Sequence, residues 1–268
     1  SLLSMMYLAQ KPSRGIVSVF GKNVNFTNRD SLAMLRRKIG VVFQDFRLLD
    51  HLSAFDNVAL PLRVCGMDEK EVKKRVTELL QWVELDKHLK APASTLSGGE
   101  KQKIAFSSVY ASVPDVLVFD EPSSNLDMKA IGELADLIQR AKISGKTILI
   151  AEHRIWYLMD IVDRVVYMQD GRIASDMEAS AFKALPEADI RRMGLRVRDL
   201  SVSESGGVKT IAADGLLSVQ KISVRLGGRN VLNDISFQAS RGEIIAIAGV
   251  NGAGKSTQVE LVRRMFAQ

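Results

Sequence analysis

The chain is short of the features that mark secreted and membrane-spanning proteins. Its single cysteine, Cys65, excludes an internal disulfide and fits a reducing compartment. Its longest apolar runs are comparable to Ile244–Ala248, well below the ~20 residues that a membrane-spanning helix needs. Ser1–Gln10 has the pattern of an ordinary amphipathic helix without a basic leader, so we expect no signal peptide there.

Charge of one sign is not concentrated anywhere either. The net charge of +6 at pH 7 would suit nucleic acid or an anionic lipid surface. However, the basic residues are scattered over helix-like stretches such as Lys70–Arg75 and Arg191–Arg198, as on solvated helix faces. The charge distribution therefore does not favour nucleic acid as a partner.

What the chain does have is a regular succession of strand and helix patterns. Val116–Phe119 and Thr147–Ala151 are almost entirely apolar, which is typical of strands buried on both faces of a sheet. Between residues 68 and 83, apolar residues recur at helical spacing. With 268 residues, 46% of them hydrophobic, the chain can bury a sizeable core. The alternation predicts an α/β fold with a mostly parallel sheet.

Composition divides the chain into three parts. Residues 1–175 carry most of the alternating pattern. Residues 176–215 are first charged and then rich in serine and glycine, which indicates a linker. Residues 216–268 begin with two strand patterns joined by Gly227-Gly228, which predict a hairpin. A buried strand, a glycine-rich loop and a helix are expected after that hairpin.

The glycine-rich loop carries the most specific signal. It reads Gly249-Val250-Asn251-Gly252-Ala253-Gly254-Lys255-Ser256, followed by Thr257, and it matches the pattern G-x-x-x-x-G-K-[ST]. Glycines allow backbone N–H groups to converge on phosphate oxygens, and the helix that follows points its positive end at the same anion. Lys255 would reach the terminal phosphates and the Ser256 hydroxyl would ligate Mg²⁺.

Polar residues follow other predicted strands. Asp120 could hold Mg²⁺ through water, and Glu121 could polarise an attacking water. Such an acidic pair is by itself more often a solvated loop end. His153 follows Thr147–Ala151 and Gln44 follows another strand pattern. Alone, a histidine there is more often structural than catalytic, and a glutamine more often a surface amide.

Ser97, Gly98 and Gly99 precede a predicted helix. Their N–H groups offer a second anion-binding helix start. The ordinary alternative for Ser97 is a plain helix N-cap.

Together these segments resemble the ATP-binding-cassette (ABC) ATPase family, over nearly all the chain except about 176–215. The motifs are Gly249–Ser256 (Walker A), Gln44 (Q-loop), Leu96–Glu100 (signature), Val116–Glu121 (Walker B), Ser123–Asp127 (D-loop) and His153 (switch histidine). The resemblance implies an α/β fold with a RecA-like parallel-sheet core, an antiparallel β subdomain and a helical signature subdomain.

The resemblance also implies ATP and Mg²⁺ as ligands. Gln44 and Asp120 would complete the metal shell with Ser256. Leu226 falls where the family usually places an aromatic side chain under the adenine. Loss of that stacking would weaken nucleotide binding by roughly 1 kcal/mol.

The same resemblance assigns the catalytic roles. Glu121 would activate water, His153 would contact the γ-phosphate, and Asp127 would communicate across a dimer of cassettes. Ser97, Gly98 and Gly99 would cover the nucleotide of the opposite cassette. The signature ends in Glu100 where glutamine is commoner, which leaves these three residues unchanged.

The order of the motifs departs from the family, because Walker A comes last instead of first. A circular permutant would have this order, with Lys255 and Glu121 in one site. However, Ser1–Gln10 and Thr257–Gln268 both resemble the helix after Walker A, as expected for a segment of a two-cassette protein. In that arrangement Lys255 would face Ser97, and this chain alone would show weak or no ATPase activity.

Residues 94–257 resemble two-cassette ATPases of energy-coupling-factor importers, which implies integral-membrane partner subunits, a second cassette and a peripheral place on the cytoplasmic face of the membrane. Residues 31–64 instead resemble the FtsE-type cell-division ATPase, which is the first alternative. Another is a soluble ABC ATPase acting on ribosomes or DNA, although the long basic linker or coiled coils of those proteins do not occur here. A module that binds ATP without turnover is a third.

Overall fold

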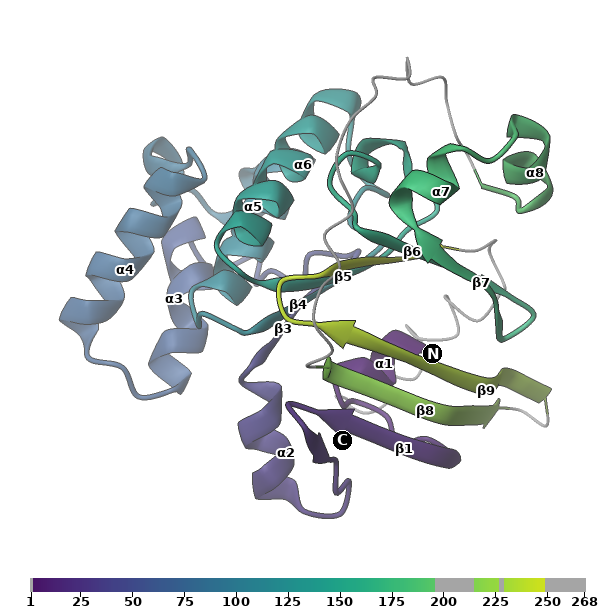
Figure 1. The fold of residues 1–268 in the computed structure, drawn as a ribbon. Coiled ribbons are helices and arrows are strands. Elements are labelled where there is room, and N and C mark those ends of the chain that lie inside the picture. The colour runs from purple at the N-terminus through teal and green to yellow at the C-terminus, as the bar shows by residue number, and fades with distance from the viewer. Residues whose placement is uncertain (1, 196–214, 227–228, 249–268) are drawn as a thin grey trace.

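The structure is a computed structural model and describes residues 2–195, 215–226 and 229–248 (Figure 1). Its main sheet has six strands in the order β3-β4-β5-β10-β6-β7. Their bounds are β3 Ile39–Val42, β4 Val116–Asp120, β5 Thr147–Ala151, β10 Ile244–Ala248, β6 Arg164–Gln169 and β7 Arg172–Glu178. The first five strands in this order are parallel, and β7 is antiparallel to β6.

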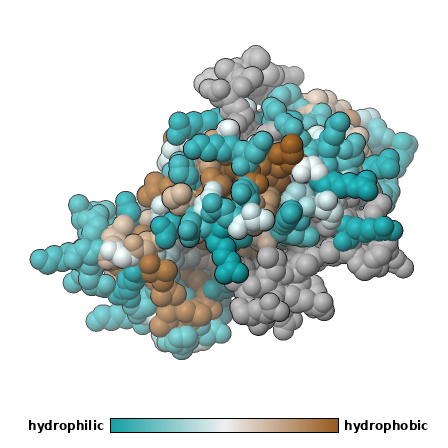
Figure 2. Space-filling model, turned by 90° about the horizontal axis from the view of Figure 1, so that it is seen from below, coloured by the Kyte–Doolittle hydropathy of each residue, from teal (hydrophilic) through white to brown (hydrophobic). Residues whose placement is uncertain are grey.

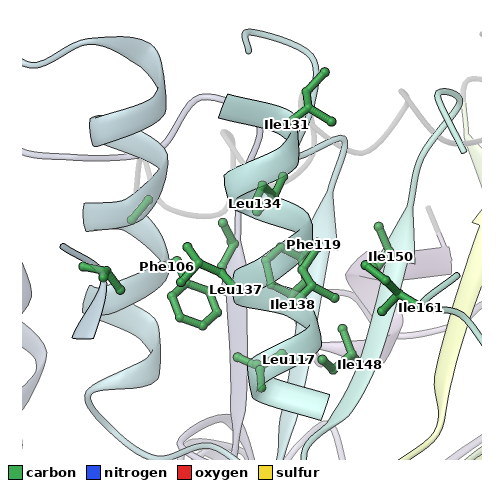
Figure 3. Close-up of a cluster of buried hydrophobic side chains, with 14 of the residues drawn as sticks. Phe106, Leu117, Phe119, Ile131, Leu134, Leu137, Ile138, Ile148, Ile150 and Ile161 are labelled. Carbon is green, nitrogen blue, oxygen red and sulfur yellow. The ribbon is translucent and has the colours of Figure 1, made fainter. Parts of the chain in front are cut away.

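The centre of the main sheet is buried on both faces. Every residue of β4 and β5 is buried, as their apolar composition predicts. Successive side chains point to opposite faces. Leu117 and Phe119 therefore join one core cluster, and Val116 and Val118 join the other. Figure 3 shows the first cluster, where side chains of α6 (Met128–Ile143) pack over β4 and β5.

Strand β10 comes from a distant part of the chain but lies inside the main sheet. It pairs in parallel with β5, where Ile245 is opposite Leu149, and with β6, where Ile245 is opposite Arg164. Because parallel strands run in the same direction, β10 ends at the same edge of the sheet as β4 and β5.

Polar contacts hold the segment before β10 to the sheet. The hydroxyl of Thr147 in β5 donates to the backbone oxygen of Ser240 (3.1 Å) and accepts from the N–H of Gly242 (2.9 Å). The guanidinium of Arg164 in β6 donates to the backbone oxygen of Gln238 (2.9 Å). Side chains of both neighbouring strands therefore fix this segment, in addition to strand pairing.

A second sheet is antiparallel and has the order β2-β1-β8-β9. Its strands are β2 Lys22–Asn23, β1 Arg14–Val19, β8 Gly215–Leu226 and β9 Arg229–Ser240. The predicted hairpin is present as β8 and β9. Figure 1 shows the purple β1 beside the green β8, so early and late parts of the chain share this sheet.

Helices α3 (Ala54–Val64), α4 (Glu69–Trp82) and α5 (Gly98–Tyr110) form a layer at the left of Figure 1. Aromatic rings connect this layer to the sheet: Trp82 stacks on Tyr110 at 5.5 Å, and Phe106 stacks on Phe119 of β4 at 6.2 Å. In the described ranges, no helix combines the length and the apolarity that crossing a bilayer requires.

The N-terminal helix differs from its prediction. Helix α1 (Leu2–Met6) is shorter than expected, and all of its residues are buried, including Ser4. The prediction of an amphipathic helix is therefore wrong. The reason is its place between the two sheets, where its apolar residues join a cluster with Val19 of β1 and Val118 of β4. Arg36, at the end of α2 (Arg29–Arg36), donates to the backbone oxygen of Leu8 just beyond α1 (2.7 Å).

Part of the segment that composition indicates as a linker packs on the main body. Residues 176–195 include the end of β7 and the short helices α7 (Ala179–Lys183) and α8 (Glu187–Arg192). Phe182, Ile190 and Leu195 are buried in the first core cluster. Residues 196–214 lie outside the described ranges.

Candidate functional site

Four parallel strands end at one edge of the main sheet, and each leads to a predicted site residue or motif. Gln44 follows β3, Glu121 follows β4 and His153 follows β5. β10 ends at this edge with Ala248, the last residue before the glycine-rich loop in the sequence. Open parallel sheets bind ligands outside the carboxyl ends of their strands. This edge is therefore the candidate site.

The predicted catalytic residues Glu121 and His153 lie together. Asp120, the last residue of β4, is only 8% exposed and is paired with Ala151 of β5. The N–H of Glu121 donates to the backbone oxygen of Ala151 (2.9 Å). Oε2 of Glu121 lies 3.9 Å from Nδ1 of His153. Glu121 has a φ of +45°, a left-handed conformation that costs free energy in a non-glycine residue and recurs at functional sites.

The environment of His153 fits a polar ligand. Its Nδ1 is buried and makes no hydrogen bond to any described residue, although Oε1 of Glu152 is 3.3 Å away. A buried polar atom without a hydrogen bond is costly, and such exceptions occur at catalytic and ligand sites. The predicted contact of His153 with the γ-phosphate is not tested by this geometry.

The predicted Mg²⁺ ligands are only partly within the described ranges. Gln44 follows β3, Asp120 ends the adjacent strand β4, and both carry oxygen atoms, which Mg²⁺ prefers. Ser256 lies outside those ranges. Among described residues, no group of three or more His, Cys, Asp and Glu side chains is placed to hold a metal. The available oxygen donors fit Mg²⁺, but the shell itself stays a prediction.

Asn125 joins three parts of the predicted site. Its side-chain amide donates to the backbone oxygen of Gln44 (3.1 Å). Its own backbone oxygen would be 3.0 Å from a Cβ atom added to Gly98, so the two backbones are in close contact. Ser123–Asp127, the predicted D-loop, therefore touches both the loop after β3 and the signature segment.

Ser97 is the N-cap of α5, which is the ordinary alternative for this residue. Its hydroxyl accepts from the N–H of Glu100 (3.4 Å) and donates to Oε2 of Glu100, and its N–H donates to the same oxygen (both 2.7 Å). The hydrogen bond from the Ser97 hydroxyl, which has the larger effect, and the one from its N–H hold the pKa of Glu100 below its usual value. The contact of Ser97 with a second cassette's nucleotide stays a prediction.

Gly99 and Asp127 bring the starts of two helices together. A Cβ atom on Gly99 would be 3.0 Å from Cβ of Ala130 in α6, so glycine permits this approach. Asp127 caps α6 by accepting a hydrogen bond from the N–H of Ala130 (2.8 Å). Its predicted role between cassettes is not tested by this contact.

The remaining predicted residues cannot be placed as side chains. The phosphate-loop residues lie outside the described ranges: Gly249, Asn251, Gly252, Ala253, Gly254, Lys255, Ser256 and Thr257. Leu226 is the last residue of β8, where its backbone pairs with Arg229. Their roles toward the nucleotide stay predictions.

Sequence analysis missed Glu152, which lies between Ala151 and His153. It is 0% exposed and accepts hydrogen bonds from the loops after β4 and β5. The sequence feature that could have identified it is its position directly after an all-apolar strand. An acidic residue at such a position is expected to be exposed, so its burial needs a specific reason.

Comparison with known proteins decides the family. The profile described as ABC transporter matches residues 1–124 and 232–268, which is more than half of the chain. The chain belongs to the ABC transporter family. The matched parts of this ABC chain contain β3 and β10 with the loops that follow them, and β4 with the first residues of its loop.

Curated relatives of this ABC chain differ in their described tasks. A putative ABC transporter ATP-binding protein of Treponema denticola is 45% identical over 233 residues, covering 84% of this chain and 48% of that protein. The methionine import ATP-binding protein MetN of Legionella pneumophila is 36% identical, covering 72% and 57%. The cell division ATP-binding protein FtsE of Streptococcus pneumoniae is 34% identical, covering 66% and 76%. The chain thus spans about half the length of the first relative.

Solved structures share the ABC fold. One is cbiO1 from Clostridium perfringens, described as part of the ABC transporter complex cbiONQ, with a TM-score of 0.64 and 30% identity over 73% of this chain and 78% of that chain. Another is the dimeric, post-hydrolysis ATP-binding cassette MJ0796 with ADP and Pi, with a TM-score of 0.61 and 30% identity over 66% and 79%. The predicted fold class is confirmed.

Proposed function

We propose that this chain is an ATP-binding part of an ABC transporter and hydrolyses ATP at the carboxyl edge of its main sheet. One observation carries the proposal: β10, which leads into Gly249–Ser256, lies beside β5 in the main sheet. The last residue before the phosphate loop in the sequence, Ala248, is therefore at the edge where Glu121 and His153 lie together.

Nucleotide binding falls to residues from several loops. The N–H groups of the glycine-rich loop and the Lys255 ammonium bind the phosphates. Ser256, Gln44 and Asp120 hold Mg²⁺ through their oxygen atoms. When bound, Mg²⁺ neutralises charge on the phosphate oxygens. Thr257 extends the phosphate loop, and Leu226 contacts the adenine side.

Hydrolysis falls to the strand-end residues. Glu121 accepts a proton from, or polarises, the attacking water, and His153 binds the γ-phosphate. Ser97, Gly98 and Gly99 cover the nucleotide of a second cassette, and Asp127 lies at that contact. ATP then joins two cassettes, and its hydrolysis lets them separate.

The position of β10 supports Lys255 and Glu121 serving the same nucleotide within one chain. In the other arrangement, the chain is a segment of a two-cassette protein. Lys255 then belongs to the second cassette and faces Ser97, while Glu121 serves the other nucleotide. Mixing two inactive variants separates these arrangements.

We expect Lys255→Ala and Glu121→Gln each to lower ATP turnover by about 100-fold or more, because each removes a transition-state contact. An equimolar mixture stays inactive if both residues serve one site of one chain. Glu78→Gln, at an exposed position of α4, is the matched control and keeps its turnover.

Recovery of turnover on mixing would show that Lys255 and Glu121 come from different chains. A wild-type turnover that Lys255→Ala does not lower would contradict hydrolysis at this loop.

We further propose that the chain serves an energy-coupling-factor-type importer from the cytoplasmic face of the membrane, with integral-membrane subunits and a second cassette as partners. Two observations support this: the sequence resemblance of residues 94–257 to two-cassette importer ATPases, and the structural similarity to cbiO1. A second candidate is a cell-division ATPase, which the 34% identity to FtsE and the resemblance of residues 31–64 support.

A further inference from the structure

Glu152 is a fully buried carboxylate at the candidate site. It follows β5 directly and is 0% exposed. A buried charge is costly unless hydrogen bonds replace its water. Glu152 therefore needs donors from its surroundings, and those donors define what it connects.

The two oxygens of Glu152 bind different loops. Oε1 accepts from the N–H groups of His153 (2.8 Å) and Arg154 (3.0 Å). Oε2 accepts from the N–H (3.2 Å) and the hydroxyl (2.6 Å) of Ser123, and from the hydroxyl of Tyr157 (3.2 Å). One side chain thus ties the loop after β4 to the loop after β5.

Tyr157 remains a donor to this carboxylate. Burial raises the pKa of the Tyr157 phenol well above its usual value, and the nearby Glu152 raises it further. The phenol therefore keeps its proton at neutral pH. Unlike Ser123, Tyr157 lies in the chain segment that follows Glu152, so its bond does not join the two loops.

We propose that Glu152 is a positioning residue that locks the Ser123 loop to the His153 loop, so that the D-loop and the switch histidine move as one unit. Its role in catalysis rests on the proposed ATP hydrolysis. Glu121 lies two residues before Ser123, and His153 follows Glu152 directly. A displacement of the D-loop is therefore transmitted to both catalytic side chains without any contact between Glu152 and the nucleotide.

Contacts of the D-loop extend this unit further. The same loop donates from Asn125 to the backbone oxygen of Gln44 (3.1 Å). A guanidinium nitrogen of Arg154 lies 3.5 Å from the backbone oxygen of Ser123, which adds a second link between the two loops. The unit thus includes the loops after β3, β4 and β5.

Glutamine cannot replace Glu152 in this arrangement. A carboxylate accepts through both oxygens, whereas an amide has one acceptor oxygen and one donor nitrogen. In Glu152→Gln the oxygen can serve the Ser123 loop or the His153 loop, and the NH₂ group then faces N–H or O–H donors of the other. The variant keeps the size of the side chain but uncouples the loops.

The first test is steady-state ATP hydrolysis by the full chain. We expect Glu152→Gln to lower kcat about tenfold or more while KM for Mg–ATP stays within about twofold, because misplaced catalytic groups slow the reaction more than they weaken binding. Tyr157→Phe removes a bond to the same carboxylate without uncoupling the loops and is the matched control, with kcat within about twofold. Equal kcat losses in the two variants would overturn the proposal.

The second test needs no turnover, so it separates failure of this inference from failure of the proposed function. Amide hydrogen exchange is followed at Ser123, His153 and Arg154, whose N–H groups Glu152 binds. We expect Glu152→Gln to speed exchange about tenfold at one loop or both, and Tyr157→Phe to change it less than about threefold. Unchanged protection in Glu152→Gln would overturn the proposal.

Should Glu152→Gln fail to fold, Ser123→Ala replaces it in both tests. It removes the hydroxyl that makes the shortest bond between the two loops and leaves the backbone N–H in place. Faster exchange of that backbone N–H and a lower kcat with unchanged KM support the proposal. An exchange rate and a kcat equal to those of Tyr157→Phe would contradict the proposal.

Discussion

Ser97 and Glu100 close the first turn of α5 by binding each other through side chain and backbone. This reciprocal arrangement satisfies N–H groups that the helix itself leaves unpaired. The same bonds hold the pKa of Glu100 below its usual value of 4.5, so its carboxylate is favoured in the folded state. A group with a lowered folded pKa stabilises the fold above its unfolded pKa, and this contribution is lost as pH falls through the folded pKa.

We expect Glu100→Ala to lower the free energy of unfolding by about 1 kcal/mol at pH 7. The difference from wild type should shrink as pH falls from about 5 through the lowered pKa, since the carboxylate is then protonated in both states. Urea denaturation at several pH values measures it. Glu78→Ala, at an exposed position of α4, is the control and should change stability by less than about 0.5 kcal/mol. A difference that stays constant with pH would contradict the assignment.

At the scale of elements, the segment before β10 depends on Thr147. This hydroxyl donates to Ser240 and accepts from Gly242, and Thr147 is fully buried. We expect Thr147→Val to lower the free energy of unfolding by about 1–3 kcal/mol, because valine keeps the shape but removes the hydrogen bonds to the N–H of Gly242 and to the backbone oxygen of Ser240, which keeps only its bond from the N–H of Glu243. Thr77→Val, at a half-buried position of α4, is the control. Chemical denaturation that shows equal stability for the two variants would contradict this anchoring.

Local patterns predicted the elements whose burial is uniform. The run Val116–Phe119 lies in β4 and Thr147–Ala151 is β5, because strands buried on both faces have no polar side to interrupt them. The helical spacing over 68–83 corresponds to α4, Glu69–Trp82, which Asp68 caps. Helix α1 was misjudged, because nothing local shows that a second sheet covers its other side.

Pairing between distant segments was not predictable in the same way. The bond between Thr147 and Ser240 joins residues 93 positions apart, and no local pattern specifies it. In the site, the ends of apolar strands suggested Glu121 and His153, which the structure brings together, and their catalytic roles stay predictions. The role of Glu152 was not predictable from sequence, because its five hydrogen-bond donors come from the segments after β4 and β5. Only the folded sheet places these two segments side by side.

At the scale of the whole molecule, apolar side chains reach the surface in separate patches among hydrophilic ones (Figure 2). One set lies on α3 and in the loop beyond Gln44: Val64 is 77% exposed, Leu49 40% and Leu60 38%. The side chain of Asn57 in α3 donates to the backbone oxygen of Leu49 (3.1 Å), so loop and helix are held together. Under the proposed transporter function, we expect an apolar segment of the membrane partner to dock on this surface.

We expect Val64→Asp to reduce co-purification with the membrane subunits of an energy-coupling-factor importer by about tenfold, because a charge would be buried at the contact. Ile143→Asp is the matched control, since Ile143 is 76% exposed at the end of α6. The membrane partner of an FtsE-type ATPase is tested in parallel. Equal capture of both variants would contradict docking at this surface, and capture by the cell-division partner alone would favour the second candidate.

The central place of β10 also has a consequence for the folding of this chain. Without Ile244–Ala248, β5 and β6 have no strand between them here, and each presents an unpaired edge. Such edges recruit other chains, and closing long loops slows folding. A form of this chain truncated before β10 is therefore prone to aggregate, and the pairing of β10 with both neighbours is the step that closes the sheet.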